Sequence, residues 1–193
     1  MMRPTLACTV LAAAILVLAF AHPNNGDTHS FAAGVIHPLS GIDHTSVMAL
    51  VGVWGALVGG RAIWAWPAIF IVAMLSGFAA AAWGPQLGFV EPAIATSIVL
   101  LGLFAALRIR LPIGLGGAVV GLFAVFHGHV HGTEAAGADL ASYAAGFTLS
   151  TASLHVAGIA IGLSIRRSLE KIAGERKRFG RRTTSSVSRG ELP

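Results

Sequence analysis

Cysteine and charge are both scarce in this 193-residue chain. The single cysteine, Cys8, excludes a disulfide framework and any site built from paired thiolates, so we expect nitrogen and oxygen metal ligands. Only 11% of the residues are charged, whereas 55% are hydrophobic and the mean hydropathy is +0.76. A soluble core of this size could not bury so much apolar side chain, so the composition predicts an integral membrane protein.

Basic residues outnumber acidic ones by 13 to 8, but most of them lie in one short segment near the C-terminus. Because they do not form an extended basic surface, we expect no nucleic acid partner. The segment 166–193 is predicted to be a basic cytoplasmic tail that rests on anionic lipid headgroups and is partly disordered.

Residues 1–21 predict a cleavable signal peptide. Arg3 supplies a positive start, residues 10–20 an apolar stretch, and residues 19–21 a small-x-small cleavage site. The apolar stretch is shorter than the ~20 residues that cross a bilayer, which favours cleavage over an uncleaved first helix. Cleavage would leave His22 first in the mature chain, as a candidate metal ligand on the outer side.

Residues 22–165 predict an all-α bundle of about five transmembrane helices. Apolar runs of about the spanning length occur near 31–59, 62–83, 89–107, 112–131 and 139–165. Arg61 and Arg108 lie in alternate connections, whereas the connections 84–88 and 132–138 contain no lysine or arginine. The positive-inside bias then predicts a multi-pass protein of the cytoplasmic (inner) membrane, with the mature N-terminus outside and the C-terminus in the cytoplasm.

The first predicted span carries His37, Asp43 and His44. The two histidines are seven residues apart, so they share a face if the helix is continuous, and Gly41 leaves space between them. Asp43 lies about 100° round the helix and either ligates a metal ion or orients an imidazole. Pro38 could instead begin or kink the helix. An ionisable cluster in a span indicates function by default, although interfacial polar residues at a helix start give the same pattern.

The fourth predicted span ends with the strongest local metal signal, three imidazoles and a carboxylate within eight residues. His127 and His131 form an i, i+4 pair that can chelate one ion. Neighbouring glycines would let the backbone loosen and bring His129 or Glu134 inward. We expect these histidines at an outer mouth that water can reach. The alternative is a solvated His-rich loop that binds metals adventitiously.

Glu91 and His155 are the remaining candidate ligands. Glu91 starts the third span on the outer side, where a carboxylate could also simply complement the helix dipole. His155 lies roughly 21 Å along the last span at 1.5 Å per residue, although a lone histidine there is often an interhelical hydrogen-bond former. Together the candidates form a gradient of imidazoles and carboxylates running inward, which suits Ni²⁺, Co²⁺, Cu²⁺ or Zn²⁺.

Four motifs occur in order along the chain: His37-Pro38-x-x-Gly41-x-Asp43-His44, Val90-Glu91-Pro92-Ala93-Ile94-Ala95, Phe126-His127-Gly128-His129-Val130-His131-Gly132-Thr133-Glu134, and Gly146-Phe147 through Leu154-His155-x-x-Gly158. This set resembles the HupE/UreJ family of membrane proteins linked to hydrogenase and urease, over roughly residues 20 to 165. The resemblance implies a nickel or cobalt permease, without a tightly bound cofactor, that supplies the ion for maturation of a metalloenzyme. It makes four residues the expected transport residues: His37, Asp43, His44 and Glu91.

Two other functions remain open. A membrane metalloenzyme with a di-metal site would suit the histidines, but such sites commonly need further ligands on the cytoplasmic side. A haem-binding or structural subunit is the other alternative, although the neighbouring carboxylates favour a divalent ion over haem. We expect a transporter and not an enzyme, with a divalent metal ion as its substrate.

Overall fold

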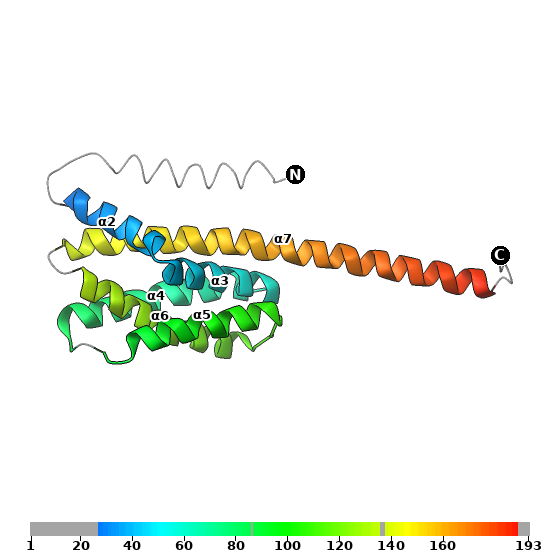
Figure 1. Cartoon of the computed structure of the whole chain (residues 1–193), viewed down its shortest axis with the longest axis horizontal. Coiled ribbons are helices and arrows are strands. Elements are labelled where there is room, and N and C mark those ends of the chain that lie inside the picture. Colours follow the sequence, from blue (N-terminus) through cyan, green and yellow to red (C-terminus); the bar gives the residue numbers. More distant parts are fainter. Residues whose placement is uncertain (1–26, 86, 136–137, 189–193) are drawn as a thin grey trace.

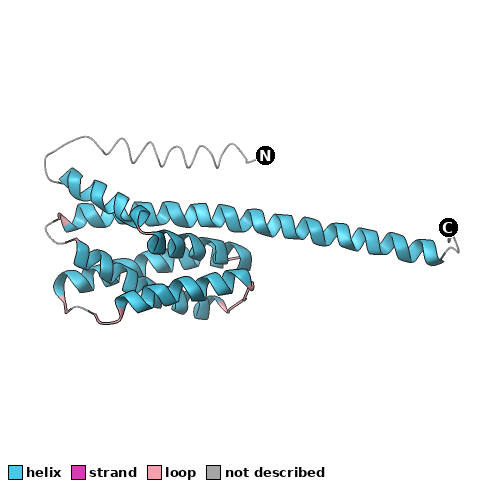
Figure 2. Cartoon of the chain, viewed as in Figure 1, coloured by secondary structure: helices cyan, strands magenta, loops and turns pink. Residues whose placement is uncertain are grey.

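The computed structural model describes residues 27–85, 87–135 and 138–188, and within these ranges the chain is all-helical (Figure 2). The helices are α2 (Asp27–Ser40), α3 (Ile42–Val58), α4 (Ala62–Trp83), α5 (Val90–Ala106), α6 (Ile113–Glu134) and α7 (Leu140–Ser188). The signal peptide expected over 1–21 and the candidate ligand His22 lie outside the described residues.

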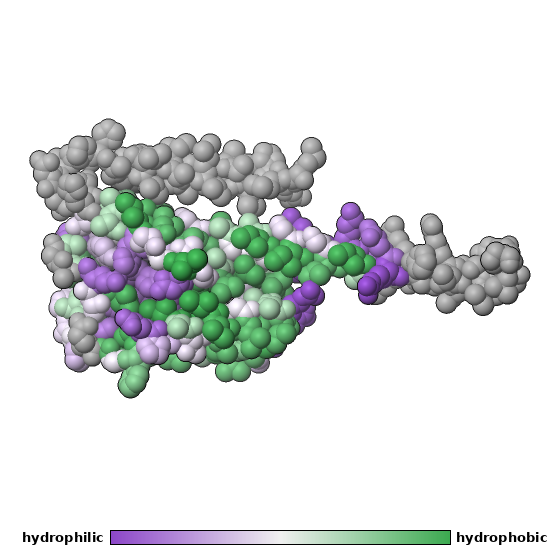
Figure 3. Space-filling view, in the orientation of Figure 1, coloured by the Kyte–Doolittle hydropathy of each residue, from purple (hydrophilic) through white to green (hydrophobic). Residues whose placement is uncertain are grey.

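Long apolar helices dominate this part of the chain. By length and composition α4, α6 and α7 can each cross a membrane, and α2 with α3 would together make a fourth span. The third apolar run, near 89–107, forms α5, a shorter helix of 17 residues. Apolar side chains cover the middle of the visible face, with hydrophilic ones toward its two ends (Figure 3). The chain is a multi-pass helical membrane protein, as the composition predicts.

The first predicted span is broken at Gly41, and the prediction of one helix over 31–59 was wrong. The axes of α2 and α3 are bent by 80° at this break. Pro38, in the last turn of α2, has no amide hydrogen for the helix ladder. The hydroxyl of Thr45 donates to the Pro38 carbonyl at 2.7 Å and satisfies an acceptor that the break frees.

Two glycines allow close helix packing at the centre of the bundle. Gly128 of α6 lies against the backbone of Met74 on α4, and a Cβ there would overlap the Met74 carbonyl oxygen. Gly158 of α7 lies in the same way against Ala49 on α3. Without a side chain at these positions, α6 packs along α4 and α7 packs along α3.

Asp139 fixes the start of α7 and ties it to α2. Its carboxylate accepts a hydrogen bond from the Ser142 amide at 2.7 Å, which holds the pKa of this carboxyl below its usual value. Its own amide donates to Ser30 Oγ at 2.9 Å. These two bonds place the first turns of α2 and α7 side by side.

The last helix continues beyond the bundle (Figure 1), and its backbone is helical over 166–188, where the sequence predicts partial disorder. Arg166 faces Glu170 one turn later, with 3.6 Å between Nε and Oε1, and such pairs support an exposed helix. Arg166 also donates to the carbonyl of Ala56 at 3.3 Å. The basic segment therefore begins beside the end of α3 and the turn that contains Arg61.

The bundle has two chemically different ends (Figure 1). The α4–α5 and α6–α7 connections lie at one end, which we call the histidine end because His37, His44 and His131 lie there. The α3–α4 and α5–α6 connections lie at the other, which we call the arginine end because it carries Arg61 and Arg108. This arrangement matches the alternating charge pattern of the connections.

Candidate metal centre

Four side chains from three helices converge at the histidine end. The members of this histidine-end cluster are His37 on α2, His44 on α3, and His131 and Glu134 on α6. One potential ligand atom from each residue lies within 4.8 Å of the other three. His37 and His44 meet across the helix break, with ring centroids 5.6 Å apart.

His131 is the central member of the histidine-end cluster. Its ring centroid lies 4.8 Å from that of His37 and 5.0 Å from that of His44. The residue is fully buried, yet neither of its ring nitrogens has a hydrogen-bond partner among the described residues. Buried polar groups are ordinarily paired with protein, water or an ion. His131 therefore offers ligand capacity that the rest of the described chain does not use.

Two carboxylates place negative charge beside these imidazoles. Glu134 Oε2 lies 2.8 Å from His37 Nε2. Asp43 Oδ1 lies 3.4 Å from His44 Nδ1 and accepts the His44 backbone N–H at 2.9 Å. Asp43 is thus placed to orient His44 from outside the cluster. A Cβ at Gly41 would lie 2.6 Å from the same Oδ1, so glycine leaves room for this carboxylate.

Aromatic rings line the inner side of the cluster. Phe147 of α7 stacks on His131, with centroids 4.9 Å apart and an interplanar angle of 8°. Tyr143, one turn earlier, lies 6.2 Å from His37. These contacts fix the imidazole planes and exclude water from one side of them. Neither residue was predicted to take part in the site; their i, i+4 spacing on the helix that carries His155 was the available signal.

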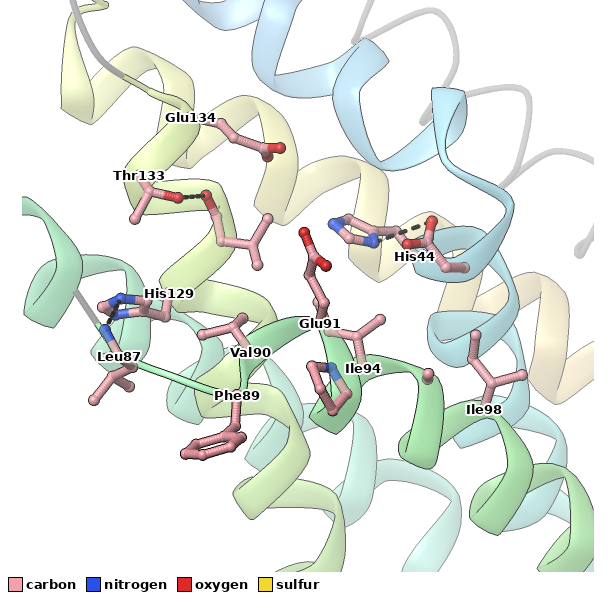
Figure 4. Close-up of a pocket in the computed structure, with 14 residues that line it drawn as sticks. His44, Leu87, Phe89, Val90, Glu91, Ile94, Ile98, His129, Thr133 and Glu134 are labelled. Carbon is pink, nitrogen blue, oxygen red and sulfur yellow. Dashed lines mark hydrogen bonds and ion pairs between the residues drawn. The ribbon is translucent and has the colours of Figure 1, made fainter.

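A cavity of about 730 Å³ opens beside the cluster (Figure 4). Its lining includes Asp43, His44, Glu91 and Glu134. Glu91 points from the start of α5 into this space, toward the cluster, but it is not one of the four cluster residues. Phe89, just before α5, has a left-handed backbone with φ 63°, so the chain turns sharply there before Glu91. Three carboxylates at one cavity attract cations.

The histidines of α6 are buried, and the prediction of a mouth that water can reach was wrong. The exposed fractions of His127, His129 and His131 are 0%, 1% and 0%. Their helix also stays regular to its last residue, where the sequence predicts a loosened backbone. Gly128 and Gly132 are the reason, because both lie against the backbone of α4 and so pack the two helices together.

His127 and His129 lie outside the cluster. His129 accepts the backbone N–H of Leu87 at its Nε2, 2.9 Å away, and so ties the α4–α5 connection to α6 (Figure 4). His127 pairs its Nδ1 with the carbonyl of Phe123 at 2.9 Å, and its ring centroid is 5.5 Å from that of His44. The predicted chelating pair is therefore split, with one member a helical turn deeper than the cluster.

His155 lies deeper still and is also separate from the cluster. Its Nδ1 is 2.7 Å from the Met48 carbonyl oxygen, a bond that joins α7 to α3. Its ring meets that of Phe70 edge to face, with centroids 5.1 Å apart. The interhelical hydrogen bond expected of a lone histidine is present, but Nε2 has no partner among the described residues.

Comparison with known proteins identifies the family. The chain matches the family described as HupE / UreJ protein over residues 9–183. It belongs to the HupE/UreJ family. It is 39% identical to Protein HupE of Rhizobium leguminosarum bv. viciae over 155 residues, which cover 79% of this chain and 81% of that protein. No solved structure matches it. Family membership confirms the resemblance carried by the four sequence motifs.

Proposed function

We propose that this chain is a permease that carries Ni²⁺, or Co²⁺, across the membrane by way of the histidine-end cluster. The supporting observation is His131, a fully buried imidazole beside two more imidazoles and a carboxylate, whose two ring nitrogens have no hydrogen-bond partner in the part of the chain that the structure describes. Nitrogen-rich sets of this kind suit late first-row divalent ions, whereas Mg²⁺ and Ca²⁺ prefer oxygen ligands. Membership of the HupE/UreJ family supports nickel or cobalt among these ions.

In this proposal the ion reaches the cluster through the cavity. Asp43, Glu91 and Glu134 line that cavity and raise the local concentration of cations. His44 and Glu134 belong both to the cavity lining and to the cluster, so they are the first ligands that an incoming ion meets. The ion then exchanges water for the imidazoles of His37 and His131.

Transport suits this geometry better than the two alternatives. The four ligand atoms lie within 4.8 Å of one another, a span that fits one ion, whereas a di-metal site holds two ions about 3.5–4 Å apart and needs more ligands. The imidazoles of the cluster also contact one another directly, with ring centroids 4.8 to 5.6 Å apart. This spacing leaves no room for a haem between two of them.

Uptake of radioactive nickel by cells that express this chain tests the proposal. We expect accumulation above that of cells carrying an empty vector, and loss of accumulation when His37, His44 and His131 are replaced together by alanine. Leu39→Ala, an exposed change next to Pro38, is the matched control and should transport normally. Equal accumulation with vector and wild-type chain would contradict the proposed function.

The ion would be carried into the cell if the arginine end faces the cytoplasm, as the positive-inside bias predicts. A reporter that is active only in the cytoplasm should then work when fused after Pro193 and fail when inserted in the α6–α7 connection. The opposite pattern would turn the cavity toward the cytoplasm and make the protein an exporter.

A further inference from the structure

The core below the histidine-end cluster contains a second group of unused ligand atoms. His127 and His155 are 0% and 1% exposed. In each, Nδ1 lies within hydrogen-bond distance of a backbone carbonyl, 2.9 Å for His127 and 2.7 Å for His155. A carbonyl can only accept, so Nδ1 carries the proton and Nε2 keeps its lone pair. Both Nε2 atoms lack a partner in the described part of the chain.

Two thioether sulfurs converge on the hydroxyl of Thr151. The hydroxyl of Thr151 lies 3.3 Å from Met48 Sδ and 3.7 Å from Met74 Sδ. All three residues are fully buried, and they come from α7, α3 and α4. The other two methionines of the chain are Met1 and Met2. Both internal methionines therefore place their sulfur atoms at the same hydroxyl, from different helices.

His155 is linked to these sulfurs through Thr151 and Met48. It follows Thr151 by one turn of α7, so the two side chains lie on one face of that helix. Met48 contacts both residues, with its carbonyl at His155 Nδ1 and its sulfur at Thr151 Oγ1. On α4, Phe70 precedes Met74 by one turn and its ring contacts both imidazoles, at 5.1 Å from His155 and 5.7 Å from His127.

We propose that His155 Nε2 and the thioether sulfurs of Met48 and Met74 form an inner metal station, which receives a late first-row divalent ion from the histidine-end cluster. This inference rests on the proposed transport function and adds a reason for its selectivity. Imidazole and thioether ligands suit Ni²⁺ and Co²⁺ far better than Mg²⁺ or Mn²⁺, which prefer oxygen. His127, one turn of α6 before His131, offers its Nε2 near both sites, because its ring contacts those of His44 and Phe70.

The role of the two methionine sulfurs can be tested without creating a cavity in the core. Met→Leu conserves volume and removes only the sulfur, so the double variant Met48→Leu/Met74→Leu should keep the fold. Leu101→Met is the matched control, because it makes the reverse exchange at a fully buried position on α5. Thermal unfolding of the purified proteins in detergent should show midpoints within a few degrees of each other.

Nickel X-ray absorption spectroscopy on the purified full chain reads the ligands directly. With one equivalent of Ni²⁺ we expect nitrogen and oxygen scattering, and with two equivalents an added sulfur contribution. That contribution should disappear in Met48→Leu/Met74→Leu and persist in Leu101→Met. Absence of sulfur scattering in the wild type at two equivalents, or its persistence in the double variant, would overturn the inner station.

The His155→Asn variant tests the role of Nε2 separately from that of Nδ1. An asparagine amide can still donate to the Met48 carbonyl in place of Nδ1, but it supplies no group equivalent to Nε2. We expect this variant to lose the second equivalent of Ni²⁺, to retain the first, and to take up nickel about tenfold more slowly. Retention of two equivalents by His155→Asn would contradict the station.

Selectivity separates failure of the station from failure of the proposed function. Excess Mn²⁺ should inhibit nickel uptake by the Met48→Leu/Met74→Leu variant about tenfold more strongly than uptake by the wild type. Uptake by the wild type with unchanged selectivity in the variant would refute the station and leave the permease intact. Sulfur-ligated nickel in a wild-type chain that transports nothing would refute the permease alone.

Discussion

The two ends of the bundle differ in how their polar groups are satisfied. At the histidine end a helix is broken, a cavity opens, and both ring nitrogens of the buried His131 lack a hydrogen-bond partner within the described ranges. Toward the arginine end, Trp54 packs on Trp66 with centroids 4.2 Å apart. Their indole N–H groups donate to the carbonyls of Ile109 and Ile113 at 2.9 and 3.0 Å.

The histidine end is therefore suited to binding an ion, whereas the tryptophan pair is a packing contact between helices. Unpaired buried nitrogens are costly to a folded protein, and they are retained where a ligand repays the cost. The paired indoles carry no such cost and seal helix against helix. Substitutions at the histidine end should therefore change transport more than stability, and substitutions at the tryptophan pair should do the reverse.

The largest effect is expected from the central imidazole. His131→Ala removes the ligand that contacts both His37 and His44, so nickel uptake should fall at least about 100-fold while the protein still reaches the membrane. Val130→Ala, the neighbouring apolar position, is the control. Uptake above a tenth of the wild-type rate in His131→Ala would remove this residue from the ion path.

A smaller loss is expected from crowding the helix break. Gly41 has φ −98° and ψ 121°, which an alanine adopts without strain, but its Cβ would lie 2.6 Å from Asp43 Oδ1. Gly41→Ala should therefore displace the carboxylate that orients His44 and lower uptake about tenfold at low nickel. Gly114→Ala, where a Cβ meets nothing within 4 Å, should transport normally. Equal uptake by the two variants would show that transport does not depend on the position of the Asp43 carboxylate.

Acid should weaken the histidine end selectively. Imidazole binds metal only when it is neutral, so protons compete with the ion for the ring nitrogens. Nickel uptake should fall severalfold as the outer pH is lowered through the acid range, and excess nickel should partly restore it. A steady rise in uptake with acidity would indicate proton-coupled import instead.

His129 should matter through the connection that it holds and not as a ligand. His129→Gln can still accept the Leu87 backbone N–H, whereas His129→Leu cannot. We expect near-normal uptake from the glutamine variant and a two- to threefold loss from the leucine variant, most visible at low nickel. Equal loss in both would indicate that the imidazole itself binds the ion.

The tryptophan pair should affect stability and leave metal binding almost unchanged. Trp66→Phe keeps an aromatic ring but removes the N–H that donates to Ile113, at a cost of about 1 kcal/mol. The unfolding midpoint in detergent should fall by a few degrees, with nickel affinity within twofold of the wild type. A tenfold change in nickel affinity would show that the tryptophan pair and the histidine end are coupled more strongly than their contacts imply.

Local sequence predicted much of the fold and part of the site. Apolar run lengths located the helices, because a span needs a fixed number of apolar residues. The ionisable pattern identified His37 and His44 as neighbours, and they meet even though the helix between them is broken. Pro38 was the local sequence feature that indicated a possible break. The choice between a kink and a continuous helix depended on a hydrogen-bond donor for the freed Pro38 carbonyl, the Thr45 hydroxyl, which apolar periodicity does not reveal.

Contacts between distant helices account for what the sequence did not predict. Gly128 suggested a loose backbone, yet it serves a close approach to α4 that no local window contains. His129 was expected among the ligands, but its partner is a backbone amide in the α4–α5 connection. The convergence of Met48 and Met74 likewise depends on how α3, α4 and α7 pack.

The histidine-end cluster is tested most directly by the ligands of a single bound nickel ion. X-ray absorption of the purified protein with one equivalent of Ni²⁺ should show scattering from about three imidazoles together with a carboxylate oxygen. His131→Ala should lose one of these imidazoles, and Glu134→Gln should keep all three. A spectrum of hydrated nickel without imidazole scattering in the wild type would contradict the assignment of His37, His44, His131 and Glu134 as the ion site.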